Sequence, residues 1–259
     1  MTETSQAFDS VADEYLRARS EYPQDLYDGI FESAELQPGS RVLDIGCGSG
    51  QATLEFATRG CNVHGIDPAK NALELLAKRS CDFSTVTLEH CSFEDYNGAS
   101  QFHLIACAQA FHWLDLSKAP DKIADLLDRG GCVALFWHLQ DLVPDSPQAE
   151  LYMMSSKYFR SFPVMNPPEY GREFIDAMAE VLENSGRFVE LRTSEYPSVK
   201  SYDPEMFKSL FRSASNYAKL DAASKFSIDG ELDDYVDKLI EAPSIHYRTC
   251  LIEARVGDA

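Results

Sequence analysis

The chain has 259 residues, and its 42 acidic side chains against 23 basic ones give a formal net charge of −19. Domains average roughly 150 residues, so this length fits one large domain or two small ones. The 44% apolar composition is ordinary for a globular protein and excludes disorder as the main state. The net charge disfavours nucleic acids and anionic membrane surfaces as partners, because both repel an acidic protein.

The cysteines and the N-terminal segment indicate where the protein works. Seven cysteines are widely spaced and form no CxxC pair, so the sequence predicts no metal site. Free thiols suit a reducing compartment. The first residues lack the basic start and the apolar run of a signal peptide. The apolar stretch 132–137 is too short to cross a bilayer. We therefore expect a cytoplasmic protein without a membrane span.

The first half of the chain predicts alternating strands and helices. Two helices are expected before residue 39, the second opened by Pro23. Short apolar runs then predict strands, and amphipathic stretches between them predict helices. The expected strands are 41–45, 62–66, 86–90, 102–107 and 132–138. The expected helices are 53–58, 68–79 and 117–128, the last stopped by Gly130 and Gly131. This alternation indicates an α/β fold, a doubly wound three-layer sandwich around a mostly parallel sheet.

The alternation fails after residue 139. Residues 141–172 contain five prolines among many aromatic side chains. A helix is expected over 173–184, strands over 187–192 and 247–253, and mostly helical structure over 200–240. Segments 141–172 and 200–225 are interpreted as a helical cap that chooses the substrate, within a single domain 1–259.

A glycine-rich turn is the most specific local pattern. Residues 42–50 read VLDIGCGSG, a strand that runs into Gly46, Gly48 and Gly50 and then into a helix. Glycine lets a ligand lie directly against the backbone, and the helix start offers free N–H groups. The spacing is G-x-G-x-G, and Gln51 stands where the dinucleotide pattern has its last glycine. Asp44, at the strand end, would face a cationic or amine-bearing ligand.

A second acidic residue ends the next strand. Asp67 follows Gly46 by 21 positions, where a carboxylate binds ribose hydroxyls in doubly wound folds. Asp67 is also predicted to cap a helix that starts at Pro68. Both roles can hold, because a cap uses one oxygen.

Several segments resemble the class I S-adenosylmethionine-dependent methyltransferases, in the small-molecule branch related to the ubiquinone/menaquinone and trans-aconitate enzymes. The resemblance lies in VLDIGCGSGQAT, GIDPAKNALELLAK, CSFEDY, CAQAFHWLD, the N-terminal FDSVADEYLRARSEYP and the late TCLIEAR. It implies a seven-stranded sheet with an antiparallel last strand and an N-terminal helical lid over residues 1–38. It also implies S-adenosylmethionine as the cofactor.

The resemblance assigns the cofactor site residue by residue. The glycine turn, with Cys47 inside it, would hold the methionine part, and Asp44 would sit near its amino group. Asp67 would hold the ribose. The remaining assignments place Pro68, Ser92 and Phe93 around the adenine, Gln109 near the methionine part, and Tyr15 and Arg19 in the lid.

The acceptor is expected to be a small molecule that is methylated on a carboxylate or a hydroxyl group. His112 is the candidate catalytic base, although a hydrogen-bonded histidine that fixes the strand end is the favoured alternative. Candidate substrate residues are Trp113, Tyr158, Arg160, Tyr170 and Arg212. The arginines would suit an anionic acceptor, or they would only pair with the acidic surface.

Two other functions stay open from the sequence. An NAD(P)-dependent oxidoreductase could use a similar sheet, but it would want a glycine at position 51, where this chain has Gln51. A non-catalytic cofactor-binding protein could keep the turn without turnover. The protein is expected to act as a monomer or homodimer.

Overall fold

The computed structural model describes residues 21–98, 101–140, 149, 153, 157–158, 168–212, 217, 219–238, 242 and 244–257. The chain forms two compact units. The sheet unit comprises residues 22–138, 173–196 and 249–259, and the second unit comprises residues 1–21, 139–172 and 197–248.

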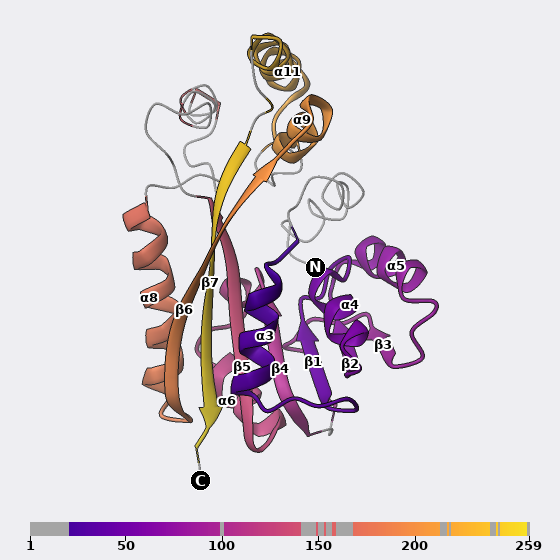
Figure 1. Cartoon of the computed structure of the whole chain (residues 1–259), viewed down its shortest axis with the longest axis vertical. Helices are drawn as coiled ribbons and strands as arrows, with labels where there is room; N and C mark the ends of the chain where they lie inside the picture. The colour runs from indigo at the N-terminus through magenta and orange to yellow at the C-terminus, as the bar shows by residue number, and fades with distance from the viewer. Residues whose placement is uncertain are drawn as a thin grey trace. The chain divides into compact units, whose positions relative to one another are not determined.

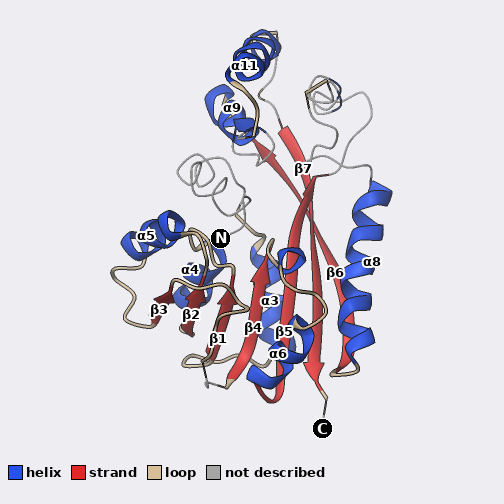
Figure 2. Cartoon of the chain, turned by 180° about the vertical axis from the view of Figure 1, so that it is seen from behind, coloured by secondary structure: helices blue, strands red, loops and turns tan. Residues whose placement is uncertain are grey.

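The described residues form a seven-stranded sheet in the order β3-β2-β1-β4-β5-β7-β6 (Figures 1 and 2). The strands are β1 (Arg41–Ile45), β2 (Asn62–Ile66), β3 (Val86–Glu89), β4 (Phe102–Ala108), β5 (Leu127–Gln140), β6 (Phe188–Ser201) and β7 (Ser244–Val256). Strands β3, β2, β1, β4 and β5 pair in parallel. Figure 1 shows β7 running against β6. The predicted α/β fold with one antiparallel strand is confirmed.

Helices connect the strands. They are α3 (Gln24–Ser33), α4 (Gln51–Thr58), α5 (Lys70–Arg79), the short 3-10 helix η1 (Phe111–Trp113), α6 (Ala119–Leu126), α8 (Pro168–Ser185), α9 (Pro204–Arg212) and α11 (Ala222–Val236). Figure 1 shows α3 in front of the sheet, and Figure 2 shows α6 on the opposite face. Helices therefore cover both faces, as right-handed connections between parallel strands require.

Predicted element boundaries fail where tertiary contacts decide them. Helix α5 begins at Lys70 after Ala69, so the predicted Asp67 cap with Pro68 at the first helical position is wrong. Helix α6 ends at Leu126, because β5 begins at once. Gly130 and Gly131 lie in β5 beside an irregularity in its pairing with β4, and they do not stop the helix. The two last strands are longer than their apolar runs.

Helix α3 belongs to the core of the sheet unit. Leu26 and Ile30 are fully buried and pack in one cluster with Phe56 of α4 and Val42 of β1. This burial makes α3 a core helix, although the sequence placed it in a lid over 1–38. Residues 1–20 of that predicted lid lie outside the described residues.

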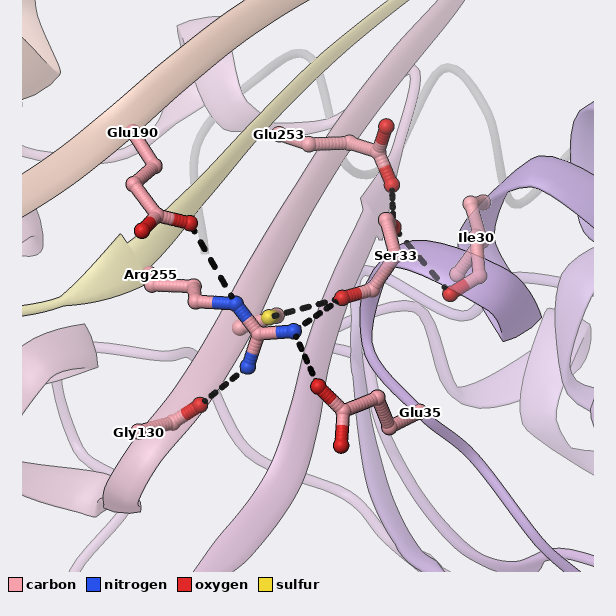
Figure 3. A network of polar contacts seen from close by, with 8 residues as sticks. Ile30, Ser33, Glu35, Gly130, Glu190, Glu253 and Arg255 are labelled. Carbon is pink, nitrogen blue, oxygen red and sulfur yellow. Dashed lines mark hydrogen bonds and ion pairs between the residues drawn. The ribbon is translucent and has the colours of Figure 1, made fainter.

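Arg255 near the end of β7 joins several elements of the sheet unit (Figure 3). Its guanidinium donates to the backbone oxygens of Ser33 and Gly130 and pairs with the carboxylates of Glu35 and Glu190. These contacts tie the end of α3 to β5, β6 and β7, so the network fixes the edge of the unit opposite the carboxyl ends of the parallel strands.

The second unit has a core of its own. Phe207 of α9 packs with Ile228 and Leu232 of α11 and with Tyr247 of β7. Asp221 caps α11 by accepting from the Ser224 N–H. The predicted cap segment 200–225 lies in this unit, and most of 141–172 lies outside the described residues. Among the described helices, none is both long and apolar enough to cross a bilayer.

Candidate functional site

The sheet order reverses direction between β1 and β4. Asp44 of β1 stands level with Gly65 of β2 on one side and with Ala106 of β4 on the other. The carboxyl ends of these parallel strands therefore lie at one edge of the sheet. Ligands of doubly wound sheets bind outside this edge, at the point where the strand order switches. The glycine turn follows β1 there, and residues 109–113 follow β4.

The three glycines of the turn have different structural reasons. All three have a positive φ. A side chain at Gly46 would meet the Ala110 Cβ at 2.4 Å, and one at Gly50 would meet the Leu76 Cδ1 at 2.1 Å. Packing alone requires these two glycines. A side chain at Gly48 would meet no heavy atom of the described residues within 4 Å. Gly48 is therefore the glycine that leaves open space above the turn.

Asp44 is a buried carboxylate with one free oxygen. Its side chain is fully buried, and its Oδ2 accepts from the Thr53 hydroxyl at 2.6 Å. Its Oδ1 has no hydrogen-bond partner among the described residues. Buried acceptors are normally paired, since leaving one unpaired costs about 1–3 kcal/mol. An unpaired buried acceptor fits a ligand that brings a donor.

Burial raises the pKa of Asp44 to about 7. The hydrogen bond from Thr53 lowers the pKa, and repulsion from the Asp67 carboxylate raises it further. The Asp44 side chain is thus poised between its neutral and charged forms near neutral pH. A cationic group at Oδ1 would favour the charged form.

Asp67 connects β2 to the glycine turn. It follows the last residue of β2, and its Oδ2 accepts from the Gly48 N–H at 2.8 Å. Its Oδ1 accepts from the Ala69 N–H at 2.7 Å, which shapes the bend before α5. The Pro68 oxygen accepts from His90 Nε2 at 3.0 Å. Both predicted acidic residues therefore lie at the same turn.

Helix α5 supports the turn from outside. The Arg79 guanidinium donates to the Ser49 oxygen at 2.5 Å, and Leu76 packs against Gly50. Sequence reasoning missed Arg79 and Thr53, because no local pattern in the sequence indicates which turn or strand end a helix side chain contacts.

The segment after β3 is held by α6. Phe93 is buried, and the Lys122 ammonium lies 4.9 Å from the centre of its ring. The same ammonium donates to the Phe93 oxygen at 2.6 Å and to the Glu94 oxygen at 3.0 Å. The Ser92 hydroxyl donates to Asp95 within the loop. Lys122, which the sequence did not single out, therefore fixes this segment.

Gln109 has a strained backbone directly after β4. Its φ is 59°, which is uncommon for a residue other than glycine. Its N–H donates to the Phe136 oxygen, and its side-chain Nε2 donates to the His138 oxygen at 3.2 Å. Two hydrogen bonds to β5 thus hold a conformation that bends the chain toward the glycine turn, where Ala110 contacts Gly46.

His112, in η1, is hydrogen-bonded to the buried indole of Trp137. The Trp137 N–H donates to His112 Nδ1 at 3.1 Å. The Phe174 ring stands edge-on to both side chains, at 5.5 Å from each. Burial lowers the pKa of His112 to about 4, so the ring is neutral at physiological pH. The neighbouring Trp113 is 57% exposed.

The remaining predicted residues lie in the glycine turn and in the second unit. Cys47 is buried, and burial raises the pKa of its thiol well above the usual value. In the second unit, the Tyr158 hydroxyl donates to Glu231, and Arg212 pairs with Asp229 at 3.0 Å. Arg212 thus pairs with an acidic residue of the chain, which is the alternative to binding an anionic acceptor that the sequence left open.

Four predicted residues have no described side chain. Tyr15, Arg19 and Arg160 lie outside the described residues, and only the backbone of Tyr170, at the start of α8, is described. The side chains that the structure describes contain no group of three or more potential metal ligands.

Comparisons with known proteins agree with this geometry. Residues 42–131 match the family model described as methyltransferase domain. An uncharacterized methyltransferase of Mycobacterium tuberculosis is 32% identical over 137 residues, which are 53% of this chain and 54% of that protein. The match thus spans about half the length of this relative.

A probable S-adenosylmethionine-dependent methyltransferase of Saccharomyces cerevisiae is 25% identical to this chain over 219 residues. The match covers 77% of this chain and 72% of the yeast protein. A solved structure also resembles the chain. It is phosphoethanolamine N-methyltransferase 2 of Haemonchus contortus, in complex with phosphomonomethylethanolamine and S-adenosylhomocysteine. Its TM-score is 0.57 at 16% identity, with 100% of this chain and 61% of that chain covered, so this likeness concerns the fold.

Proposed function

The chain carries a methyltransferase domain on the fold of the class I S-adenosylmethionine-dependent methyltransferases, and from this premise we propose that it transfers a methyl group from S-adenosylmethionine to a small-molecule acceptor. The observation that carries the proposal is the buried Asp44 Oδ1, which has no hydrogen-bond partner among the described residues.

The residues at the turn fit the methionine part of the cofactor. S-adenosylmethionine brings an ammonium group, and the Asp44 Oδ1 is an acceptor that lacks a donor. The backbone at Gly48 leaves room for a ligand to approach. A pyrophosphate would place negative charge beside Asp44, so the same residues disfavour a nicotinamide dinucleotide.

Asp67 fits the ribose. Each of its oxygens already accepts one backbone N–H, and a carboxylate oxygen can accept a second hydrogen bond. We propose that ribose hydroxyls donate to Asp67 at the end of β2, where its carboxylate also holds the turn. The segment around Phe93, which Lys122 holds in place, follows the strand next to β2 and is where we place the adenine.

A small-molecule acceptor is supported by charge. The net charge of −19 opposes binding to nucleic acids. The Haemonchus contortus protein of the same fold was solved in complex with phosphomonomethylethanolamine, a small phosphorylated amine. When bound, the cofactor supplies the reactivity, and the protein contributes orientation and electrostatics.

Product formation tests the proposal. The protein is incubated with S-adenosylmethionine and a panel of small acids, alcohols and amines, and S-adenosylhomocysteine is measured. We expect this product with at least one class of acceptor and no oxidation of the panel with NAD or NADP. Tight cofactor binding without any product would favour the non-catalytic alternative.

A further inference from the structure

One hydrogen bond decides which nitrogen of His112 carries its proton. The Trp137 indole nitrogen can only donate, so His112 Nδ1, at 3.1 Å, has to accept. A neutral imidazole with an accepting Nδ1 carries its hydrogen on Nε2. The His112 Nε2 is therefore a donor, and it has no partner among the described residues.

The surroundings hold the ring in this state. Trp137 is 1% exposed, so its N–H has no access to water and depends on His112. Aromatic side chains surround the ring: Trp113 of η1 at 4.7 Å, Phe174 of α8 at 5.5 Å, and Trp137 of β5. Burial is the sole cause of its lowered pKa, and no charged group contributes.

If His112 acted as a general base, it would lose its hydrogen bond from Trp137. For Nε2 to take a proton from an acceptor, it must first lose its own hydrogen. The neutral ring would then carry the hydrogen on Nδ1, where it would face the Trp137 N–H. Two N–H donors would then face each other, and the buried Trp137 N–H would lose its hydrogen bond. This loss disfavours the tautomer with its hydrogen on Nδ1 by about 10-fold or more.

Building on the proposed methyl transfer, we infer that His112 is a fixed hydrogen-bond donor that binds an anionic oxygen of the acceptor, and that it is not a general base. Ala110, two residues earlier, contacts Gly46 of the turn, so η1 adjoins the proposed cofactor site within the sheet unit. The acceptor class is then a carboxylate or another oxygen that is already ionised.

This acceptor class makes a base unnecessary. One carboxylate oxygen forms the new bond to the methyl carbon with its own electron pair. The bond between that carbon and the sulfonium sulfur breaks, and its electron pair stays on sulfur. No proton moves, and the products are a methyl ester and S-adenosylhomocysteine. His112 donates to the second carboxylate oxygen and orients the first.

Nuclear magnetic resonance tests the tautomer on the intact protein. A long-range proton–nitrogen correlation spectrum distinguishes the two nitrogens, and His112→Gln assigns the signals. We expect Nε2 to be protonated and the ring to stay neutral from pH 5 to 8. A hydrogen on Nδ1, or protonation of the ring near pH 6.5, would overturn the inference.

A ligand titration tests the role. The S-adenosylhomocysteine-loaded protein is titrated with aliphatic and aromatic monocarboxylates, and with primary alcohols of the same carbon skeletons as controls. We expect the Nε2–H signal to shift with at least one carboxylate and with none of the alcohols. The inference fails if no carboxylate moves this signal or if the alcohols move it equally.

A variant pair separates donation from structure. Gln keeps a donor near the Nε2 position, whereas Ala removes it. His112→Ala should raise the KM of an ionised acceptor at least about 10-fold, and His112→Gln should restore most of this loss. Equal KM values in the two variants would contradict the donor role. If the protein does not bind S-adenosylmethionine in calorimetry, the proposed function fails, while the tautomer is still decided by resonance.

Discussion

The Asp67 Oδ2 accepts from the backbone N–H of Gly48 at 2.8 Å, so the end of β2 directly holds the turn that follows β1. One carboxylate thereby links the two segments that the sequence assigned to the methionine part and to the ribose of the cofactor. The relationship gives Asp67 a structural role in addition to the ribose role proposed for it.

Asp67→Asn should weaken both the turn and cofactor binding. The amide can accept through one oxygen only, so one of the two backbone hydrogen bonds is lost. Hydrogen bonds to a charged group contribute roughly 1.5–3 kcal/mol each. We expect a loss of stability of about this size in urea unfolding and a weaker affinity for S-adenosylmethionine. The control Asp28→Asn weakens one exposed ion pair with Arg59, so it should cost only about 0–1 kcal/mol and leave the affinity for S-adenosylmethionine unchanged.

Asp44 should make stability fall as pH rises. Its folded-state pKa of about 7 lies above the ordinary pKa of 3.8 for this side chain, so between these pH values the folded protein holds a proton that the unfolded chain releases. Asp44→Asn removes this effect. We compare the free energy of unfolding of the variant with that of the wild type. Between pH 4 and pH 8 this difference should shift in favour of the variant by on the order of 3 kcal/mol. Urea unfolding at several pH values measures it, and a pH-independent difference would contradict the raised pKa.

The thiols should differ widely in reactivity. Cys81 is exposed and Cys91 is half-buried, whereas Cys47 and Cys107 are buried with strongly raised pKa values. Thiolates are the reactive form, so a maleimide should label Cys81 first and leave Cys47 and Cys107 unmodified in the folded protein. Mass spectrometry after brief labelling checks this order. Early labelling of Cys47 would show that the turn opens to solvent.

Arg255→Met should destabilise the sheet unit. The side chain joins the end of α3 to three strands through two backbone oxygens and two carboxylates (Figure 3). Loss of this network should cost about 1–2 kcal/mol. The matched control is Arg41→Met, which breaks one largely exposed pair with Asp128 and should cost about 0–1 kcal/mol. Equal losses in the two variants would show that the network adds nothing to stability.

The early strands could be predicted from the sequence with their observed limits. Arg41–Ile45 and Asn62–Ile66 are short apolar runs between clear turn residues, and such runs define buried parallel strands. Asp44 and Asp67 were found because they end these strands. The late strands were predicted too short, because much of β6 consists of exposed or half-buried residues with no apolar run to reveal them.

The supporting contacts of the site could not be predicted. Thr53, Arg79 and Lys122 act through contacts between helices and turns that no local pattern encodes. The tautomer of His112 in η1 depends on Trp137, which is 25 positions away in β5. Spacing in the sequence indicates which residues reach the edge of the sheet, but packing decides which atoms are left free there.

The most direct test of the cofactor site is a calorimetric titration with S-adenosylmethionine. Gly48→Val fills the open space above the turn, and Gly186→Val is the matched control, since both glycines have a positive φ and no heavy atom within 4 Å of an added Cβ. The account predicts binding by the wild type and by Gly186→Val, and loss of binding in Gly48→Val with the fold retained. Unchanged affinity in Gly48→Val would contradict it.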